Sequence, residues 1–600
     1  MIVKMKRLTL LCLDTHRDAT LESLRGLGVV HVADRRAPEG VELEALRARL
    51  ADAERALHAL PAERVPAGTA AAEAERPAGE LVADVLASLE RRRELGDHTD
   101  TLRRELARYG GFGEFDLDDV RELAEAGIAT ALGVAPATAD LVAPDGILLT
   151  VLQRDRQRQY FGLVAAGGWE AVPPDLGAGY DLIPWPDRSL RALRQELDAD
   201  ATEVEGLAAR LESLASGREA VAQYVARTAD AVRVAEVRAG MDEAEQVSFL
   251  SGYLPVHDCD ALRGAAEEHG WGIVLDDPEP GEDVPTLLHQ ARWVKPVRTV
   301  FDFLQIYPGY WESDVGWVFL PFFSLFFAMI VGDAGYAILL LLLTVFLQRR
   351  LKKVPPHVFH MMYVVGGATL LWGVITGGYF GIPTLPRYAA ALEIAWIKDR
   401  DNLIDLCFLI GAVHLSFAHV WNAVTLVRER SWSKVPAQVG WLVVVWSMFF
   451  LARQAVLGRA MPGYLIYLLI AGIVLVAVFM KTPKELKAEW IDHALLPLTI
   501  IGNFVDILSY IRLFAVGYAS VAVLAAFNDM AASIGFDSVL TAVAASLLLL
   551  FANALNIVLA GLGVLVHAVR LNTLEFSTHK GLAWQGHNQY TPFARRREAA

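Results

Sequence analysis

Hydrophobic and polar residues are distributed differently in the two halves of this 600-residue chain. Before Val300, charged residues are frequent and apolar residues recur at strand-like and helix-like spacings. After Gly316, apolar runs follow one another, and several approach the roughly 20 residues that cross a bilayer as a helix. The pattern therefore predicts a soluble N-terminal half and a helical, membrane-spanning C-terminal half.

The C-terminal pattern predicts eight transmembrane helices. The first two are short. Residues 332–335 between them read Gly-Asp-Ala-Gly, and we interpret this tetrapeptide, with its helix-breaking glycines and its charge, as a turn. The seventh run would be about 60 Å long as one helix, against roughly 30 Å of hydrocarbon, so it must tilt strongly or break. We expect spans at about 316–332, 335–349, 357–380, 402–427, 434–456, 461–480, 493–534 and 537–573.

Basic residues indicate the orientation of these spans. The N-terminal apolar run is too short and too charged for a secretory signal, so we expect the first half to stay in the cytoplasm. Cytoplasmic loops of membrane proteins are enriched in lysine and arginine. The four segments that eight spans would leave in the cytoplasm are all basic, namely 348–353, 428–434, 481–487 and 594–600. Both termini are therefore expected in the cytoplasm.

The soluble half shows one strand–helix–strand pattern twice, in residues 4–34 and 247–276. Two long helical arms lie between the copies, and the second spaces apolar residues by three or four from Leu190 to Leu214. A bundle helix would show similar spacing, but strand-like segments within 110–186 favour an antiparallel coiled coil with a lobe at its far tip.

These patterns together predict a multidomain chain. An N-terminal soluble α+β rod, with two α/β lobes joined by an antiparallel coiled coil, precedes an all-α polytopic membrane domain of eight transmembrane helices, the last two long and tilted. A rod of this kind suits a spacer or lever arm better than an enzyme. The expected segments are 1–40 and 239–300 (proximal lobe), 41–108 and 187–238 (coiled-coil arms), 109–186 (distal lobe) and 301–600 (membrane domain and tail).

Composition agrees with this division and excludes several classes of function. Hydrophobic residues make up 54% of the chain and charged residues 21%, a combination that one soluble domain would not have. The net charge of −15 shows no basic nucleic-acid surface, and three scattered cysteines give no disulfide framework or zinc site. Walker A, GxGxxG and HExxH patterns are absent from the sequence. We expect no cofactor, no metal and no catalytic site.

The seventh span carries Arg512 where a lipid-facing helix would have leucine. Arginine stays protonated, and placing one at mid-bilayer costs roughly 3 kcal/mol on insertion scales and about 10 or more in some simulations. Asp506 lies about 120° away around the helix, so an intrahelical ion pair is not expected. Arg512 must therefore face another helix, water or a partner, and its field would favour ionisation of an approaching carboxylate.

The last span carries a continuous face of small and polar residues. Helix packing alone would explain about half of this stripe, and snorkelling to the headgroups is an alternative role for the arginine at its end. In the fourth span, His414 and His419 lie nearly opposite one another, and we expect core histidines rather than a relay. The stripe consists of Asn553, Asn556, Ala560, Gly563, His567 and Arg570.

Four segments of the membrane half form motifs that are specific in combination. They read GNFVDILSYIRLFAVGYA (502–519), FFAMIVGDAGYA (326–337), WGVITGGYFGIP (372–383) and LVHAVRLNTLEF (565–576). These motifs resemble the membrane-embedded stator of rotary V/A-type ATPases, which is called subunit I in bacteria and archaea and subunit a in eukaryotes. The resemblance covers most of the chain.

In that family, the last two helices face a rotating ring of proteolipids, each with one ion-carrying carboxylate, and two half-channels reach the ring from opposite sides. The resemblance implies that Arg512 keeps the passing carboxylate ionised and that Arg570 assists it. An Arg512 held by an acid of its own chain would contradict this role. The candidates for lining the half-channels are Asn503, Asp506, Ser509, Tyr510, Asn553, Asn556, His567 and Glu575.

The resemblance also implies partners: a proteolipid ring, peripheral stalks on the cytoplasmic rod and, indirectly, the central-stalk connector and the soluble ATPase sector. It implies a multi-pass protein of the bacterial plasma membrane, in contact with lipid and not with nucleic acid. The transported ion, H⁺ or Na⁺, stays open. The alternatives are a secondary active transporter, although no repeat relates 316–430 to 434–576, and a structural anchor, which has no use for Arg512.

Overall fold

A computed structural model describes most of the chain, in two compact units. Residues 596–600 of the predicted basic tail lie outside the described residues. The first unit comprises Met1–Leu10, Leu27–Ala33 and Gly252–Phe593, and the second Leu11–Gly26, Asp34–Ser251 and Ala594–Ala600. The described ranges are 1–33, 36–61, 76–143, 145–166, 179–244, 246–382, 392–488, 490–586 and 588–595.

Both copies of the predicted strand–helix–strand pattern are present, and their strands interleave in one sheet. The sheet has the order β2-β8-β1-β9, and the short strand β7 (Asp242–Ala244) pairs with β8. Buried and less buried residues alternate along β1, as expected for a strand with one covered face. The copies are β1 (Met5–Leu13), α1 (Arg17–Leu27) and β2 (His31–Ala33), then β8 (Val247–Pro255), α8 (Cys259–His269) and β9 (Gly272–Asp276).

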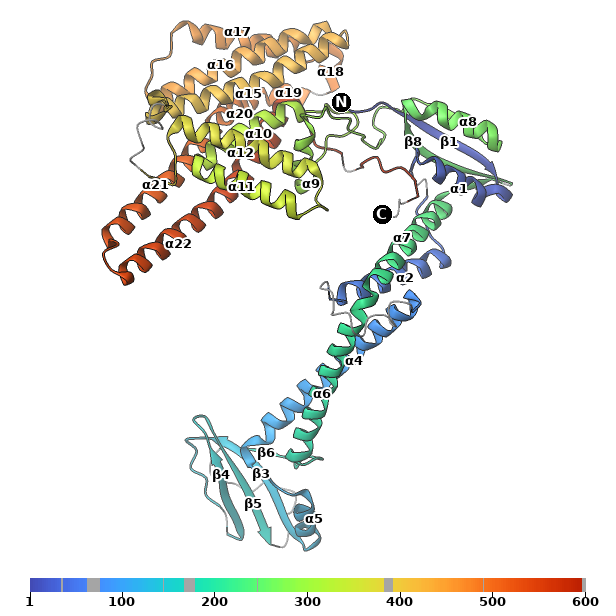
Figure 1. Cartoon of the computed structure of the whole chain (residues 1–600), viewed down its shortest axis with the longest axis vertical. Helices are drawn as coiled ribbons and strands as arrows, with labels where there is room; N and C mark the ends of the chain where they lie inside the picture. Colours follow the sequence, from blue (N-terminus) through green and yellow to red (C-terminus); the bar gives the residue numbers. More distant parts are fainter. Residues whose placement is uncertain are drawn as a thin grey trace. The chain divides into compact units, whose positions relative to one another are not determined.

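Among the described residues, the predicted coiled-coil arms of the second unit each contain two helices. In Figure 1, α4 lies beside α6, and α2 lies beside α7. A short 3₁₀ turn at Ala215–Gly217 separates the two helices of the return arm. The helices are α2 (Val41–Ala59), α4 (Ala78–Tyr109), α6 (Leu190–Leu214) and α7 (Arg218–Gly240).

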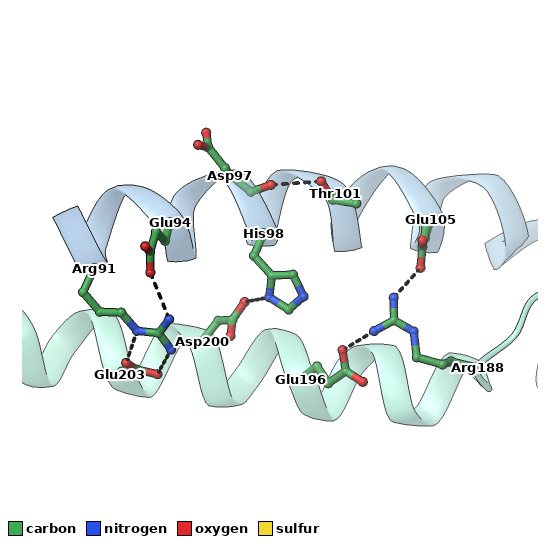
Figure 2. Close-up of polar contacts among 10 residues, drawn as sticks. All are labelled: Arg91, Glu94, Asp97, His98, Thr101, Glu105, Arg188, Glu196, Asp200 and Glu203. Carbon is green, nitrogen blue, oxygen red and sulfur yellow. Dashed lines mark hydrogen bonds and ion pairs between the residues drawn. The ribbon is translucent and has the colours of Figure 1, made fainter.

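The contact between α4 and α6 is polar in its middle, which the apolar spacing did not predict (Figure 2). Arg91 donates to both carboxylate oxygens of Glu203, from Nε at 2.7 Å and from Nη2 at 3.1 Å. This hydrogen bonding lowers the pKa of Glu203 below its usual value. His98 Nδ1 lies 2.7 Å from Asp200 Oδ2. Because a bidentate ion pair has a demanding geometry, these pairs favour one register of the two helices.

The distal lobe is a four-stranded antiparallel sheet in the order β4-β5-β3-β6. Its core continues into the helical arms, because Leu102 of α4 and Leu193 of α6 are buried in one cluster with Leu132 of the sheet. The three predicted strands of this lobe are confirmed. The elements are α5 (Leu117–Glu125), β3 (Ile128–Pro136), β4 (Ile147–Arg154), β5 (Arg158–Ala166) and β6 (Asp181–Ile183).

The C-terminal part of the first unit is helical, as predicted, and helices occupy all eight predicted span positions. By length and composition, five described stretches could cross a membrane: Pro356–Thr376, Arg400–Arg428, Trp432–Leu457, Leu496–Ile534 and Val539–Lys580. Two shorter apolar helices occupy further predicted positions, so the count of eight spans stays a prediction. The helices are α9 (Arg298–Leu304), α10 (Gly316–Val331), α11 (Ala334–Arg350), α12 (Pro356–Thr376), α15 (Arg400–Arg428), α16 (Val435–Leu457), α17 (Tyr464–Phe479), α20 (Leu496–Ser509), α21 (Ile511–Ile534) and α22 (Val539–Gly563).

The predicted turn at 332–335 docks onto the C-terminal end of α12. The side chain of Asp333 accepts hydrogen bonds from two backbone amides in the first turn of α11 and so caps that helix. Ala334 N donates to Gly378 O at 2.7 Å. A Cβ on Gly373 would overlap the backbone of Ala334, so only glycine permits this approach. Two of the four motifs therefore pack against each other.

Candidate functional site

The seventh predicted span is broken at Tyr510, which separates α20 from α21. Its length required either tilt or such a break. Tyr510 is completely buried, and its hydroxyl lies 2.8 Å from His414 Nδ1. The break places Arg512 in the first turn of α21, where its Nε donates to Ser509 O at 2.9 Å. A cation at the carbonyl end of α20 is favourably placed with respect to the helix dipole.

Arg512 belongs to a charge cluster with Glu575 and Arg570. Its Nη2 donates to Glu575 Oε1 at 2.6 Å, and Arg570 Nε lies 3.5 Å from the same oxygen. The Glu575 side chain is 4% exposed, the Arg512 side chain 22% and the Arg570 side chain 52%. Glu575 Oε2 is buried and has no hydrogen-bond partner among the residues that the structure describes. Two guanidinium groups thus share one carboxylate, and with all three ionised the cluster has a net charge of +1.

The last helix changes its geometry at this cluster. It is α-helical through α22 and then contains two π-helical segments, η7 (Val564–Ala568) and η8 (Leu571–Phe576). Glu575 lies in η8, and Arg570 lies just before it. π-helical turns are rare in proteins, and those that occur are frequently found at functional sites. This region is therefore a candidate functional site. The sequence spacing gave no sign of these turns.

The sequence left another helix, water or a partner open as the group that Arg512 faces, and the structure places Glu575 of another helix against it. The sequence excluded only an intrahelical pair with Asp506, and Asp506 indeed bonds elsewhere, with His579. Glu575 lies 63 residues away on another helix, which helical spacing alone cannot relate to Arg512. In the isolated chain Arg512 is therefore paired with an acid of the same chain, the arrangement that the sequence analysis named as contradicting a free arginine, and is not a free cation.

Asp506 belongs to a second polar group, a hydrogen-bonded chain of side chains from four helical segments. Asp506 Oδ2 lies 3.1 Å from His579 Nε2, and His579 Nδ1 lies 2.9 Å from His419 Nε2. His419 Nδ1 lies 3.0 Å from Gln438 Oε1. These four residues are called the histidine chain below. The side chain of His579 is 4% exposed and that of Asp506 is 27% exposed.

Hydrogen-bond chemistry gives the histidine chain a direction. An amide oxygen only accepts, so a neutral His419 donates from Nδ1 to Gln438 and accepts at Nε2 from Nδ1 of His579. The other ring nitrogen of His579, Nε2, then lies against Asp506 Oδ2.

The histidine chain lines a cavity of about 580 Å³. Asn503 lines the same cavity, and its Oδ1 is buried with no hydrogen-bond partner among the described residues. A polar cavity of this size has room for several water molecules. His579 was missed by the sequence analysis because it lies beyond the predicted end of the last span at residue 573.

Both histidines of the fourth span are buried. His414 is completely buried and stacks on Phe576 with ring centroids 4.7 Å apart, as expected of a core histidine. His419 is also buried, and both of its ring nitrogens have hydrogen-bond partners, Gln438 and His579, so it too has the surroundings of a core histidine.

The other candidates divide into two groups: Asn553 and Asn556 contact Tyr336, whereas Ser509 and His567 lie near Arg512. Asn553 Oδ1 accepts from the hydroxyl of Tyr336 at 2.7 Å, and Asn556 Nδ2 lies 3.5 Å from the same hydroxyl. These contacts join the last helix to α11. Ser509 donates to the carbonyl of Val505 in its own helix at 2.9 Å. His567 is half-buried, and its Nδ1 has no hydrogen-bond partner in the described part of the chain.

Comparison with known proteins identifies the family. No protein-family model matches the chain. The "V-type ATP synthase subunit I 1" of Treponema pallidum is 32% identical over 636 residues, which cover 99% of this chain and 100% of that protein. The chain belongs to the subunit I family of V/A-type ATP synthases. The V-type ATP synthase subunit I of Borreliella burgdorferi is 28% identical and covers 99% of both chains.

Archaeal relatives extend the similarity. The A-type ATP synthase subunit I of Methanocaldococcus jannaschii is 24% identical over 70% of this chain and 65% of that protein. A crystal structure of the cytoplasmic N-terminal domain of a subunit I covers 45% of this chain and 99% of that chain at 15% identity, with a TM-score of 0.22. We draw nothing about the fold from so weak a likeness. As a subunit I, the chain is a membrane subunit of a V/A-type ATPase, in agreement with its five candidate spans.

Proposed function

We propose that this chain is the stator of the membrane sector of a rotary V/A-type ATPase and forms two ion half-channels against a proteolipid ring. The observation that carries the proposal is similarity to subunit I along the whole chain, together with a positive charge cluster on its last two helices. The catalytic sites for ATP would lie on other subunits.

In this proposal a ring carboxylate meets the whole cluster of Arg512, Glu575 and Arg570 rather than a free arginine. The net charge of +1 attracts a carboxylate and lowers the pKa of an approaching acid, which favours release of its ion. Arg512 Nη1 has no hydrogen-bond partner among the described residues and is the donor left for a ring carboxylate. Between encounters, Glu575 compensates a guanidinium that would otherwise be buried without an anion.

The two half-channels are assigned to different candidates. The cavity beside Asp506 and Asn503 adjoins the start of α20 and the end of the last helix, which both lie at the predicted cytoplasmic side. We assign the cytoplasmic half-channel to it. Asn553 and Asn556 meet the start of α11, at the predicted opposite side, and with His567 they are our candidates for the second half-channel.

The histidine chain favours H⁺ as the transported ion. Imidazole rings in series pass protons between their two nitrogens, whereas hard metal cations bind to oxygen ligands. The rings of His419 and His579 are in direct hydrogen-bond contact and so provide a path that only protons can follow.

Replacing His579 with leucine is expected to lower ATP-driven acidification of vesicles by roughly tenfold or more, because a positioned proton-transfer group commonly contributes a factor of about 10²–10⁴. Acidification is measured with a pH-sensitive dye, with and without Na⁺. His360→Leu, at an exposed position of α12, is the control. Normal acidification by His579→Leu, or transport that requires Na⁺, would contradict the proton path.

The soluble rod is proposed to hold peripheral stalks, so that the stator does not turn with the ring. Detergent extraction and pull-down of the full chain are expected to recover ATP-hydrolysing subunits and a small proteolipid. Recovery of the chain alone, with ion or solute transport activity, would favour a secondary transporter. Recovery with soluble proteins but no proteolipid would favour a structural anchor.

A further inference from the structure

Two cavities at the junction between the soluble half and the first apolar helix are lined by the same two helices, α9 and α12. One, of about 250 Å³, is lined by Arg298 of α9 and by His357 at the start of α12. The other, of about 390 Å³, is lined by Val300 of α9 and Val358 of α12. Residues of the two linings alternate along α9, and both cavities also reach the first turn of α12, so both lie against the same two helices. They are called the polar cavity and the apolar cavity below.

The polar cavity carries a net positive charge. Lys295 and Arg298 line it, and His357 adds a third basic group. Asp302 offsets part of this charge, since its Oδ2 lies 3.5 Å from Arg298 Nε and 3.7 Å from His357 Nε2. Asp302 Oδ1 also accepts a hydrogen bond from the Tyr307 hydroxyl at 2.6 Å. With a neutral histidine, two cations face one carboxylate, which leaves a charge of +1.

Three of the residues that line these cavities carry a buried polar atom with no hydrogen-bond partner among the described residues. Thr286 is 6% exposed, and its Oγ1 is buried without a hydrogen-bond partner among the described residues. Gln290 Nε2 is in the same situation, and both residues line the polar cavity. Thr299, which lines the apolar cavity, carries a third such atom, Oγ1, in the described chain. Buried polar groups are nearly always satisfied, so each of these atoms needs a polar partner, which can be water or a polar ligand.

The apolar cavity extends from α9 to the last helix. Its walls include Phe323 of α10, Met361 of α12 and Val564 of the π-helical segment η7. Phe303, which lines this cavity, is 73% exposed, and Trp293, which precedes α9 in the chain, is 58% exposed. Tryptophan concentrates at membrane–water interfaces, so these side chains are placed as expected for the boundary between headgroups and hydrocarbon.

We propose that the two cavities bind one anionic phospholipid, with its phosphodiester headgroup in the polar cavity and an acyl chain in the apolar cavity. The cations attract the phosphate, and the hydroxyl of Thr286 and the amide of Gln290 can donate to its oxygens. The bound lipid would contact α9 and also Val569, which directly precedes Arg570. This site thus connects the membrane boundary of the soluble half with the helix that carries the charge cluster.

Native mass spectrometry of the full chain in detergent tests this site. With added phosphatidylglycerol, one tightly held lipid per chain is expected, and phosphatidylcholine should bind at least about tenfold more weakly. The double variant Lys295→Gln/Arg298→Gln should bind phosphatidylglycerol about thirtyfold more weakly, since each basic residue near an anionic lipid changes affinity about fivefold. Met361→Trp, which fills the apolar cavity, should also lose the lipid.

The control is the double variant Arg349→Gln/Arg350→Gln, which removes the same charge from exposed positions of α11 outside both cavities. It should retain the lipid. Equal binding of the two lipids, or unchanged binding by the Lys295/Arg298 double variant, would overturn the proposal. A competition experiment with inorganic phosphate tests whether the polar cavity binds a free anion instead of a lipid. Suppose that phosphate displaces the lipid at comparable concentration and that the Met361→Trp variant still binds phosphate. The polar cavity is then a site for a free anion, and the lipid proposal is wrong.

Discussion

Replacing Arg512 with alanine is expected to abolish ATP-driven acidification of vesicles while the complex still assembles. The substitution removes the donor left for a ring carboxylate and leaves Glu575 with Arg570 alone, so the cluster becomes neutral. A ring carboxylate is then neither attracted nor kept ionised. Because removal of one preorganised electrostatic group commonly slows catalysis by about 10²–10³, we expect a loss of at least about 100-fold.

Two further variants sharpen this test of Arg512. Arg428→Ala, at the exposed end of α15, should acidify vesicles normally. Arg512→Lys keeps the charge, but an ammonium lacks the planar fork that now bonds Ser509 and Glu575 together, so it should also transport poorly. Near-normal acidification by assembled Arg512→Ala would refute the assigned role.

Replacing Glu575 with glutamine is expected to have the second-largest effect, a loss of acidification of roughly tenfold or more. The amide keeps the shape of the side chain but removes the only anion of the cluster, which then has a charge of +2. A ring carboxylate would be held more strongly and released more slowly. ATP hydrolysis that is coupled to rotation should slow in parallel.

Assembly and coupling must be measured together for Glu575. Removing one partner of a buried ion pair commonly destabilises a protein by about 3–5 kcal/mol, so size-exclusion chromatography of each complex accompanies the vesicle assays. Glu575→Asp, which retains the charge, should transport better than Glu575→Gln. Asp529→Asn, at an exposed position of α21, is the matched control. Wild-type rates in an intact Glu575→Gln complex would show that Glu575 takes no part in transport.

Local sequence patterns predicted the elements well and their contacts poorly. The strands around Val247 and the apolar helices were predictable because alternation and hydrophobic runs are properties of neighbouring residues. The sequence predicted that the seventh span must tilt or break, because one helix of that length does not fit a bilayer. It did not predict that the interruption would lie at Tyr510. The polar middle of the contact between α4 and α6 was missed because helical spacing counts apolar residues only.

The candidate site depends on contacts between helices, which spacing along one helix does not reveal. The pair of Arg512 with Glu575 and the pair of Asp506 with His579 both join residues of different helices. The stripe on the last helix assumed uninterrupted α-helical geometry. At the π-helical segment η8, Arg570 Nε and Glu575 Oε1, five residues apart in the sequence, lie 3.5 Å from each other, a contact that α-helical spacing does not predict.

The most direct measurement is the distance from the Arg512 guanidinium to the nearest ring carboxylate in the assembled complex, resolved in its separate rotational states. The account predicts at least one state in which these groups lie within about 4 Å, while Glu575 remains beside Arg570. If Arg512 is bound only to Glu575 in every state, with each ring carboxylate more than about 10 Å away, a screened distance at physiological salt, the account is wrong.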